Sequence, residues 1–211
     1  MAERINTPEF HDSAELHVKG RATYVDDIPV PSTCLHILLG LSKIASGEIS
    51  KIDLQGVRDS LGIVDVITAK DIPGKNDSSP IFGDDPIFAE NEVFYDGQVI
   101  FGVIAETLES AKVAIKKAKI EYLEKPPIIT LEQAKLEKTL LCAPKTLSRG
   151  DFAPSIKHSN FLVEGEISIG GQEHFYLEGQ AALALPKEGE DIQIYVSSQH
   201  PTEVQHKVAD V

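Results

Sequence analysis

Cysteine, tryptophan and methionine are scarce in this chain of 211 residues, which has two Cys, one Met and no Trp. Cys34 and Cys142 are far apart and are the only cysteines. They are too few for a disulfide framework, a four-cysteine zinc site or a protein-held iron–sulfur cluster. If the protein handles electrons or metals, the cysteine ligands must lie outside these residues.

Positive charge is also in short supply, with 20 basic residues against 33 acidic residues and a formal net charge of −13. A field of this sign repels phosphate backbones and anionic lipids. We therefore exclude nucleic acid and a membrane surface as primary partners.

The chain has no long hydrophobic run and no leader-like segment. Its longest apolar run, around Val99 to Ala105, is far shorter than the roughly 20 residues that cross a bilayer. The opening residues MAERINTPEF have neither an apolar stretch nor a small-residue cleavage site. We therefore expect a cytoplasmic protein.

Three common catalytic motifs are missing. The sequence contains no GxSxG, no GxxxxGK[ST] and no GxGxxG. Nucleophile-elbow hydrolases, P-loop enzymes and dinucleotide-binding Rossmann folds would each need one of these motifs.

What is present is typical of a folded protein, because 42% of the residues are hydrophobic and 25% are charged. In the first half, residues 34–41 and 64–68 predict strands, and Asp53 predicts the cap of a short helix ending near Ser60. Residues 70–86 are rich in proline, glycine and aspartate, which predicts a long loop of functional or interface type.

The clearest predicted unit spans residues 98–122. An apolar strand over 98–105 is followed by Thr107, which can cap a helix, and then by a strand at 120–122. We interpret this order as a βαβ unit. Lysines crowd the end of its helix at Lys116, Lys117 and Lys119, where they oppose the helix dipole.

The second half predicts a short surface helix over 131–137 and then a sheet of at least three strands. The alternating apolar residues of 161–169 indicate the first strand, and residues 180–185 and 191–196 indicate two more. A final helix begins at Pro201 and continues to the last residue.

The densest group of reactive side chains lies in Gly170 to Glu178. A metal site would use His174 and Glu178 at helical i, i+4 spacing. The two glycines and the neighbouring strands favour a turn with hydrogen-bonded polar residues instead. We therefore predict no direct metal ligand and no catalytic residue here.

Five segments of the sequence form a recognisable set: GRATYVDDIP (20–29), TAKDIPGKN (68–76), AENEVFYDGQ (89–98), GGQEHFYLE (170–178) and VSSQ (196–199). Together they resemble the molybdopterin-binding subunit of xanthine dehydrogenase, in the xanthine dehydrogenase/aldehyde oxidase family. The resemblance covers the chain from about residue 10 to its end, and QEHFYLE (172–178) is closer to the xanthine dehydrogenase branch.

The resemblance implies an α+β fold, with an a/b hammerhead domain followed by the first strands and helix of the molybdenum-cofactor-binding domain. We accordingly divide the chain into an extended lead-in (1–33), the hammerhead domain (34–125), a linker (126–155) and the truncated start of the cofactor domain (156–211).

The family hydroxylates hypoxanthine or xanthine with oxygen taken from water. Its cofactor is a molybdenum–pterin group, and its electrons leave through 2Fe-2S clusters and FAD to NAD. The resemblance therefore implies three partners: the iron–sulfur/FAD subunit, the remainder of the molybdenum subunit and a purine substrate.

Residue by residue, Gln199 matches the glutamine whose side-chain amide hydrogen-bonds an oxygen ligand of molybdenum. A primary amide suits that role because it donates a hydrogen bond without titrating. A segment that shapes the approach to the cofactor pocket matches Gly170, Gly171, Gln172, Glu173 and His174.

The family's GGGFGGKE segment, its substrate-binding arginine and its catalytic glutamate are not found in the sequence. We therefore expect the chain alone to be inactive. Two alternatives stay open: a non-catalytic interaction module that pairs with the iron–sulfur/FAD subunit, and a parent enzyme of the aldehyde oxidase type.

Overall fold

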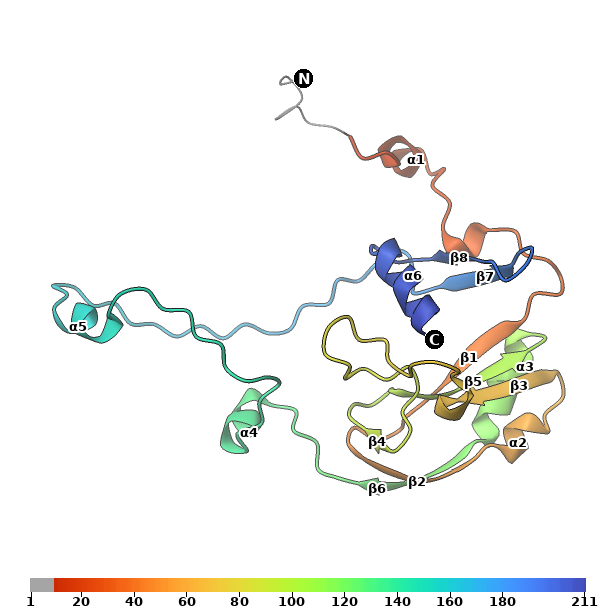
Figure 1. Cartoon of the computed structure of the whole chain (residues 1–211), viewed down its shortest axis with the longest axis horizontal. Coiled ribbons are helices and arrows are strands. Elements are labelled where there is room, and N and C mark those ends of the chain that lie inside the picture. The colour runs from red at the N-terminus through yellow and green to blue at the C-terminus, as the bar shows by residue number, and fades with distance from the viewer. Residues whose placement is uncertain (1–9) are drawn as a thin grey trace. The chain divides into compact units, whose positions relative to one another are not determined.

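The computed structural model describes residues 10–211, and residues 1–9 of the expected lead-in lie outside it (Figure 1). The chain divides into two units. The first combines the residues up to Lys125 with Tyr176–Val211, and the second is Pro126–Phe175. The described part of the lead-in is not wholly extended, because it forms α1 (Ala14–Val18) and the 3-10 turn η1 (Val25–Asp27).

A three-stranded sheet contributes much of the buried core of the first unit. Its strands are β1 (His36–Leu41), β5 (Val99–Ala105) and β3 (Ile63–Thr68), in the order β1-β5-β3. Both pairings are antiparallel, with Leu39 opposite Gly102 on one side and Ile67 opposite Gly102 on the other. The central position of β5 explains its nearly continuous apolar sequence, since both edges and both faces are covered.

A second sheet has the order β4-β2-β6, from β4 (Glu92–Val93), β2 (Gly47–Asp53) and β6 (Lys119–Glu124). Strand β2 was not predicted. The βαβ interpretation of residues 98–122 is wrong, because β5 and β6 lie in different sheets and each pairs antiparallel with its neighbours. The strand–helix–strand order was predicted correctly, but it does not determine which strands pair.

Two short helices contact the strands of the first sheet. In α3 (Leu108–Ala114), Thr107 is the N-cap as predicted, and its side-chain oxygen accepts a hydrogen bond of 3.1 Å from the Ser110 amide. The 3-10 turn η3 (Ile115–Lys117) then leads to β6. In α2 (Gln55–Arg58), Asp53 precedes the N-cap by one residue and accepts from the Gln55 amide at 3.1 Å.

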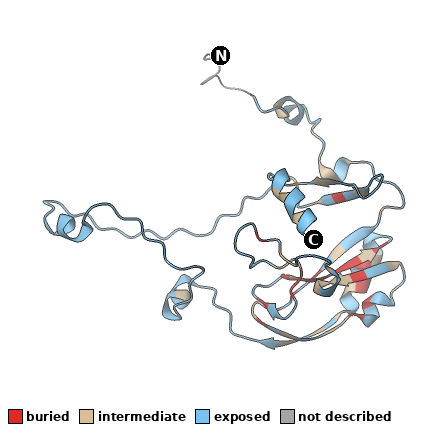
Figure 2. Ribbon diagram, in the orientation of Figure 1, coloured by how far each residue is buried: buried red, intermediate tan, exposed pale blue. Residues whose placement is uncertain are grey.

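The buried core lies between β5, α2 and α3 (Figure 2). A close contact fixes one edge of it, since a Cβ on Gly40 would lie 2.2 Å from the Phe101 ring. Glycine at this position therefore lets β1 approach β5 over the aromatic ring. The core cluster comprises Leu54, Val57, Val66, Ala89, Ile100, Phe101, Val103, Ala105, Ala111 and Ala114.

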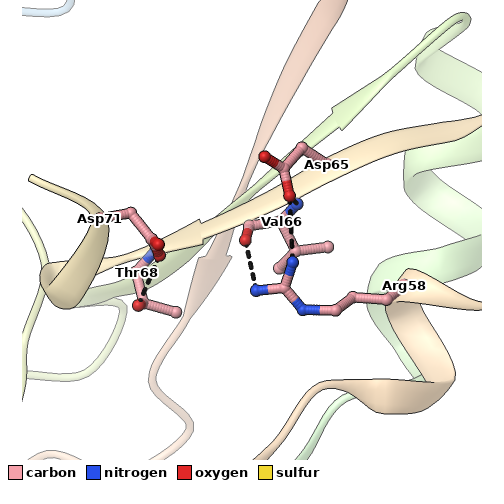
Figure 3. A network of polar contacts seen from close by, with 5 residues as sticks. All are labelled: Arg58, Asp65, Val66, Thr68 and Asp71. Carbon is pink, nitrogen blue, oxygen red and sulfur yellow. Dashed lines mark hydrogen bonds and ion pairs between the residues drawn. The ribbon is translucent and has the colours of Figure 1, made fainter.

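Polar contacts join α2 to β3 and close the turn that follows it (Figure 3). The Arg58 guanidinium donates to Asp65 Oδ1 at 3.0 Å and to the Val66 carbonyl at 2.6 Å. Beyond β3, the backbone amide and hydroxyl of Thr68 both donate to Asp71 Oδ2, at 2.8 and 2.9 Å, at the 3-10 turn η2 (Ala69–Asp71). These hydrogen bonds lower the pKa of Asp71.

The predicted loop forms, and it is held by its own polar side chains. The Asn76 side chain accepts from the Phe88 amide at 2.9 Å and donates to the Phe88 carbonyl at 2.8 Å. The buried Ser79 hydroxyl accepts from the Gly83 amide at 2.6 Å. The loop therefore has a defined conformation without helix or strand from residue 72 to residue 91.

The second unit contains only short helices, α4 (Leu131–Leu136) and α5 (Phe152–Lys157). The strand predicted over residues 161–169 is wrong, because this segment has no regular structure and is exposed throughout. The apolar alternation is present, but no strand within residues 10–211 pairs with it. A single strand cannot satisfy its backbone groups alone.

The C-terminal part of the first unit consists of β7 (Ala182–Pro186), β8 (Ile192–Val196) and α6 (Pro201–Asp210). The two strands form an antiparallel hairpin, so the predicted sheet of three or more strands has two. Helix α6 begins at the predicted proline. No helix in the described range is long and apolar enough to cross a membrane.

Candidate functional site

A groove of about 1030 Å³ lies in the first unit, beside the turn that joins β8 to α6. Its wall combines two residues of β1 with residues 176–182 and 196–199, which are far away in the sequence. The lining residues are Ile37, Leu39, Tyr176, Leu177, Glu178, Gln180, Ala181, Ala182, Val196, Ser197, Ser198 and Gln199.

The β7–β8 hairpin places Gln199 on this wall. Just outside the ladder, the Ser197 hydroxyl accepts from the Ala181 amide at 3.0 Å, and the Ser197 amide donates to the Ala181 carbonyl at 3.2 Å. One residue beyond Gln199, the His200 ring nitrogen caps α6 by accepting from the Glu203 amide at 3.2 Å. Gln199 is therefore held between an anchored strand end and a capped helix.

The side chain of Gln199 is exposed, and it makes no hydrogen bond to any residue between 10 and 211. Its amide can donate two hydrogen bonds and does not titrate. The other polar residues of the wall are mostly neutral as well. Gln199 can therefore hydrogen-bond a polar group in the groove without exchanging a proton with it.

Glu178 is the carboxylate of this wall, and a backbone contact occupies it. Its Oε1 accepts from the Val25 amide at 2.8 Å, which ties residues 153 positions apart. The described residues contain no group of three or more side chains that could hold a metal ion. Glu178 thus serves to attach the segment 176–181 to the turn η1.

The other predicted site residues lie in the second unit. Gly170 and Gly171 are exposed, and a Cβ on either would meet nothing within 4 Å. Glu173 Oε1 accepts from the Phe175 amide at 3.4 Å, where Phe175 has a positive φ of 53°. Gln172 and His174 are exposed too. The structure thus brings Gln199 into a groove, whereas Gly170 to His174 form a solvent-facing segment.

Helix α6 is attached to the loop of residues 72–91. The Lys75 amide donates to the Asp210 carbonyl at 2.9 Å, and Lys207 lies 3.8 Å from Asp77. Hydrogen bonds from Ser79 lower the pKa of Asp77, and the nearby Lys207 lowers it further. The loop predicted to be an interface element therefore contacts the helix that follows Gln199.

Sequence reasoning missed the contribution of Ile37 and Leu39 to the groove. The nearly continuous apolar run of β1 indicates a strand, but no local signal shows what each of its faces contacts. The bond between Glu178 and Val25 was missed for the same reason. Both involve contacts between segments more than a hundred residues apart.

The lining suits a cofactor that brings its own metal ligands. The neutral amide of Gln199 offers hydrogen bonds, whereas the wall supplies no cluster of metal-ligating side chains. Cys34 and Cys142 are both free thiols and neither lines the groove. The residues present therefore fit a hydrogen-bonding role toward such a group and not direct coordination.

Two family models match the chain. The a/b hammerhead domain of aldehyde oxidase and xanthine dehydrogenase matches residues 19–126, and the molybdopterin cofactor-binding domain matches residues 134–211. The fold predicted from the sequence, a hammerhead domain plus the start of a molybdenum-cofactor domain, is thereby confirmed.

The chain is similar to parts of much longer proteins. It is 40% identical to aldehyde oxidase 2 of Rattus norvegicus, covering 99% of this chain and 15% of that protein. It is 37% identical to xanthine dehydrogenase 2 of Arabidopsis thaliana, covering 98% of this chain and 16% of that protein. A solved aldehyde oxidoreductase from Desulfovibrio gigas aligns with a TM-score of 0.76 at 26% identity, over 89% of this chain and 23% of that one.

Proposed function

Because the chain belongs to the aldehyde oxidase and xanthine dehydrogenase family of molybdenum-containing oxidoreductases, we propose that it supplies the hammerhead domain and one wall of the cofactor site in a molybdenum hydroxylase. The observation that carries this proposal is the position of Gln199, with an amide free to donate, on a groove within the region matched to the molybdopterin-binding domain.

In this proposal Gln199 donates a hydrogen bond toward the molybdenum–pterin group. When bound, that group supplies the two-electron redox chemistry of the reaction. The Gln199 amide orients it without exchanging a proton with it, because an amide does not titrate. In the complete molybdenum subunit, a second segment would shape the approach to the cofactor pocket. This segment comprises Gly170, Gly171, Gln172, Glu173 and His174.

We assign the parent enzyme to the xanthine dehydrogenase type, with hypoxanthine or xanthine as substrate. The assignment rests on the likeness of residues 172–178 to that branch. An aldehyde substrate is the second candidate, because the chain is also 40% identical to an aldehyde oxidase. The identities to an aldehyde oxidase (40%) and to a xanthine dehydrogenase (37%) differ too little to distinguish the two substrates.

The proposal places the remaining machinery on partners in the cytoplasm. The iron–sulfur/FAD subunit would receive the electrons through 2Fe-2S clusters and FAD, since the two cysteines of this chain cannot hold such clusters. The rest of the molybdenum subunit would supply the catalytic acid–base group. In this arrangement, residues 126–155 form the linker between the domains at 34–125 and 156–211. The chain alone should therefore bind no stoichiometric molybdenum and should not turn over xanthine.

Two glutamines on the same wall provide a matched test. The chain would be co-expressed with the remainder of a xanthine dehydrogenase molybdenum subunit and its iron–sulfur/FAD subunit, as wild type, Gln199→Ala and Gln180→Ala. We expect Gln199→Ala to lower xanthine turnover or molybdenum content about 10- to 100-fold, as loss of a hydrogen bond next to a metal site does. Gln180→Ala should match the wild type.

Equal losses in the two variants would remove the specific role of Gln199. Turnover of an aromatic aldehyde but not of xanthine would replace the purine assignment with the aldehyde one. Measurable xanthine turnover by the chain alone would contradict the division of the site between chains.

The second candidate function, from another class, is a non-catalytic module that pairs with the iron–sulfur/FAD subunit. The exposed apolar side chains of the second unit, such as Phe161 and Val163, favour it. A pull-down with that subunit discriminates: a specific 1:1 complex that lacks activity supports the module, whereas polydisperse aggregates contradict it.

A further inference from the structure

A second groove, of about 500 Å³, lies between the end of β1, the turn η3 and strand β6. Apart from Leu39, its lining is distinct from that of the Gln199 groove. The volume is within the range of about 300 to 1,000 Å³ that is usual for small-molecule sites. Its apolar lining comprises Leu39, Leu41, Phe101, Ile115, Ile120 and Tyr122.

Three lysines line the same groove and come from three different segments. Lys43 follows β1, Lys116 lies in η3 and Lys119 begins β6. None of the three forms an ion pair or a side-chain hydrogen bond with a residue in the described range. Positive charge without partners thus gathers at one place in a chain whose formal net charge is −13.

The groove has little negative charge to balance these lysines. Its one lining carboxylate, Glu121, lies 3.6 Å from Lys51, which is not part of the lining. Burial raises the pKa of Tyr122, so its hydroxyl stays neutral. The lining therefore combines an apolar surface with a net positive rim.

The dipole of α3 explains only part of this arrangement. Lysines at a helix end interact favourably with its negative pole, which accounts for Lys116 and for its neighbour Lys117. It does not account for Lys43, which belongs to another segment but lines the same groove. Lys117 instead donates to the Ser60 hydroxyl at 2.8 Å and does not line the groove.

We propose that this groove binds an amphipathic monocarboxylate, with its hydrocarbon chain against the apolar lining and its carboxylate among Lys43, Lys116 and Lys119. An apolar chain loses water-exposed surface on entering the groove, and its carboxylate meets lysines that form no ion pair with residues 10–211. The site is independent of the molybdenum cofactor, so it can exist whether or not the proposed enzyme function holds.

Decanoate is the probe, and the 211-residue chain is the protein. Isothermal titration calorimetry should show saturable 1:1 binding of decanoate. In NMR spectra, the backbone amide chemical shifts of Gly40, Ile120 and Tyr122 should change on binding. Acetate, which has the charge without the chain, and decyltrimethylammonium, which has the chain with the opposite charge, should not bind. Because exposed charges are screened by salt, the decanoate affinity should fall as ionic strength rises.

A charge reversal with a matched control tests the lysines. The double variant Lys116→Glu/Lys119→Glu should weaken decanoate binding at least about tenfold, because it places like charges beside the carboxylate. Lys117→Glu makes the same kind of change in the same turn, off the groove, and should bind as the wild type does. If circular dichroism shows that the double variant is unfolded, Lys116→Ala/Lys119→Ala replaces it.

Three results would each overturn the proposal. Decyltrimethylammonium could bind as tightly as decanoate, the double variant could keep the wild-type affinity for decanoate, or the amide chemical shifts could change only at residues away from the groove. A concentration-dependent dimer that covers the groove and excludes decanoate would overturn it too, because the occupant would then be a second copy of the chain.

Discussion

The hammerhead part of the first unit and the second unit have the same kinds of residues but very different packing. Phe101 on β5 is 1% exposed, whereas Phe161 in the second unit is 90% exposed. In residues 126–175 no side chain is fully buried, although this region carries many large apolar residues (Figure 2). The difference comes from pairing: β5 has β1 and β3 beside it, whereas residues 161–169 pair with no strand of the described part of the chain.

Apolar side chains in a strand-like pattern are therefore buried only where another element packs against them. Burial removes apolar surface from water and stabilises the fold in proportion to the area covered. The alternation in residues 161–169 places apolar side chains on one face. A neighbouring strand would still be needed to pair the backbone N–H and C=O groups and to contact those side chains.

The largest contrast is expected from the same substitution in the two regions. Phe101→Ala should lower the free energy of unfolding by about 3–5 kcal/mol, because it leaves a cavity in the core. Phe161→Ala should leave it unchanged, since that ring is exposed. Urea titrations followed by circular dichroism measure both. A comparable loss in Phe161→Ala would show that the second unit is packed.

A smaller contrast is expected from added methyl groups. Gly40→Ala places a Cβ 2.2 Å from the Phe101 ring and should cost about 1–3 kcal/mol of stability by overpacking. A Cβ on Gly165, in the second unit, meets nothing within 4 Å, so Gly165→Ala should cost nothing. Urea midpoints that shift equally in the two variants would contradict the packing of β1 against β5.

Helix caps provide the next comparison. Thr107 and Thr130 each accept a hydrogen bond of 3.1 Å from the backbone three residues on. Thr107→Ala should lower the free energy of unfolding by about 1 kcal/mol, because α3 buries Ala111 and Ala114. Thr130→Ala should not change it, because α4 has no buried residue. Thermal melts of the two variants measure this difference.

Acid should produce the smallest effect, and only in the first unit. Hydrogen bonds lower the folded-state pKa of Asp71 and Asp77, so their contribution is present above the unfolded pKa of about 3.9 and is lost as pH falls below it. Urea midpoints measured from pH 6 to pH 3 should fall less steeply in Asp71→Asn and Asp77→Asn than in the wild type. An unchanged slope in both variants would contradict this contribution.

Local signals in the sequence predicted much of the fold. Thr107 marked the start of α3, Pro201 marked the start of α6, and the apolar run of β5 indicated a strand covered on both sides. Each of these signals acts over a few residues, so no knowledge of distant segments is needed.

Pairing could not be predicted in the same way. Strand β2 was missed because its two isoleucines, Ile49 and Ile52, are three residues apart and break the alternation that marks a strand. The register shift between Ile49 and Lys51 accommodates this spacing in the sheet. The segment 161–169 was assigned to a strand for the opposite reason, since its pattern is clear and its partner is absent within residues 10–211. Strand pairing depends on residues far away in the sequence, which a local pattern does not report.

The candidate site shows the same division. Gln199 was identified by resemblance, and the anchored end of β8 explains its place on the wall. Ile37 and Leu39 complete that wall from β1 and could not be predicted. The roles of Gln199 and of Gly170 to His174 toward the cofactor stay predictions, for which the matched glutamine variants are the test.

Amide hydrogen exchange of the whole chain, read by mass spectrometry, tests most directly the claim that the Gln199 wall is built within the first unit while the Gly170–His174 segment is uncovered. The account predicts slow exchange in β5, β8 and α6, and exchange at the rate of an unstructured peptide across residues 161–175. Protection of residues 161–175 equal to that of β8 would contradict it.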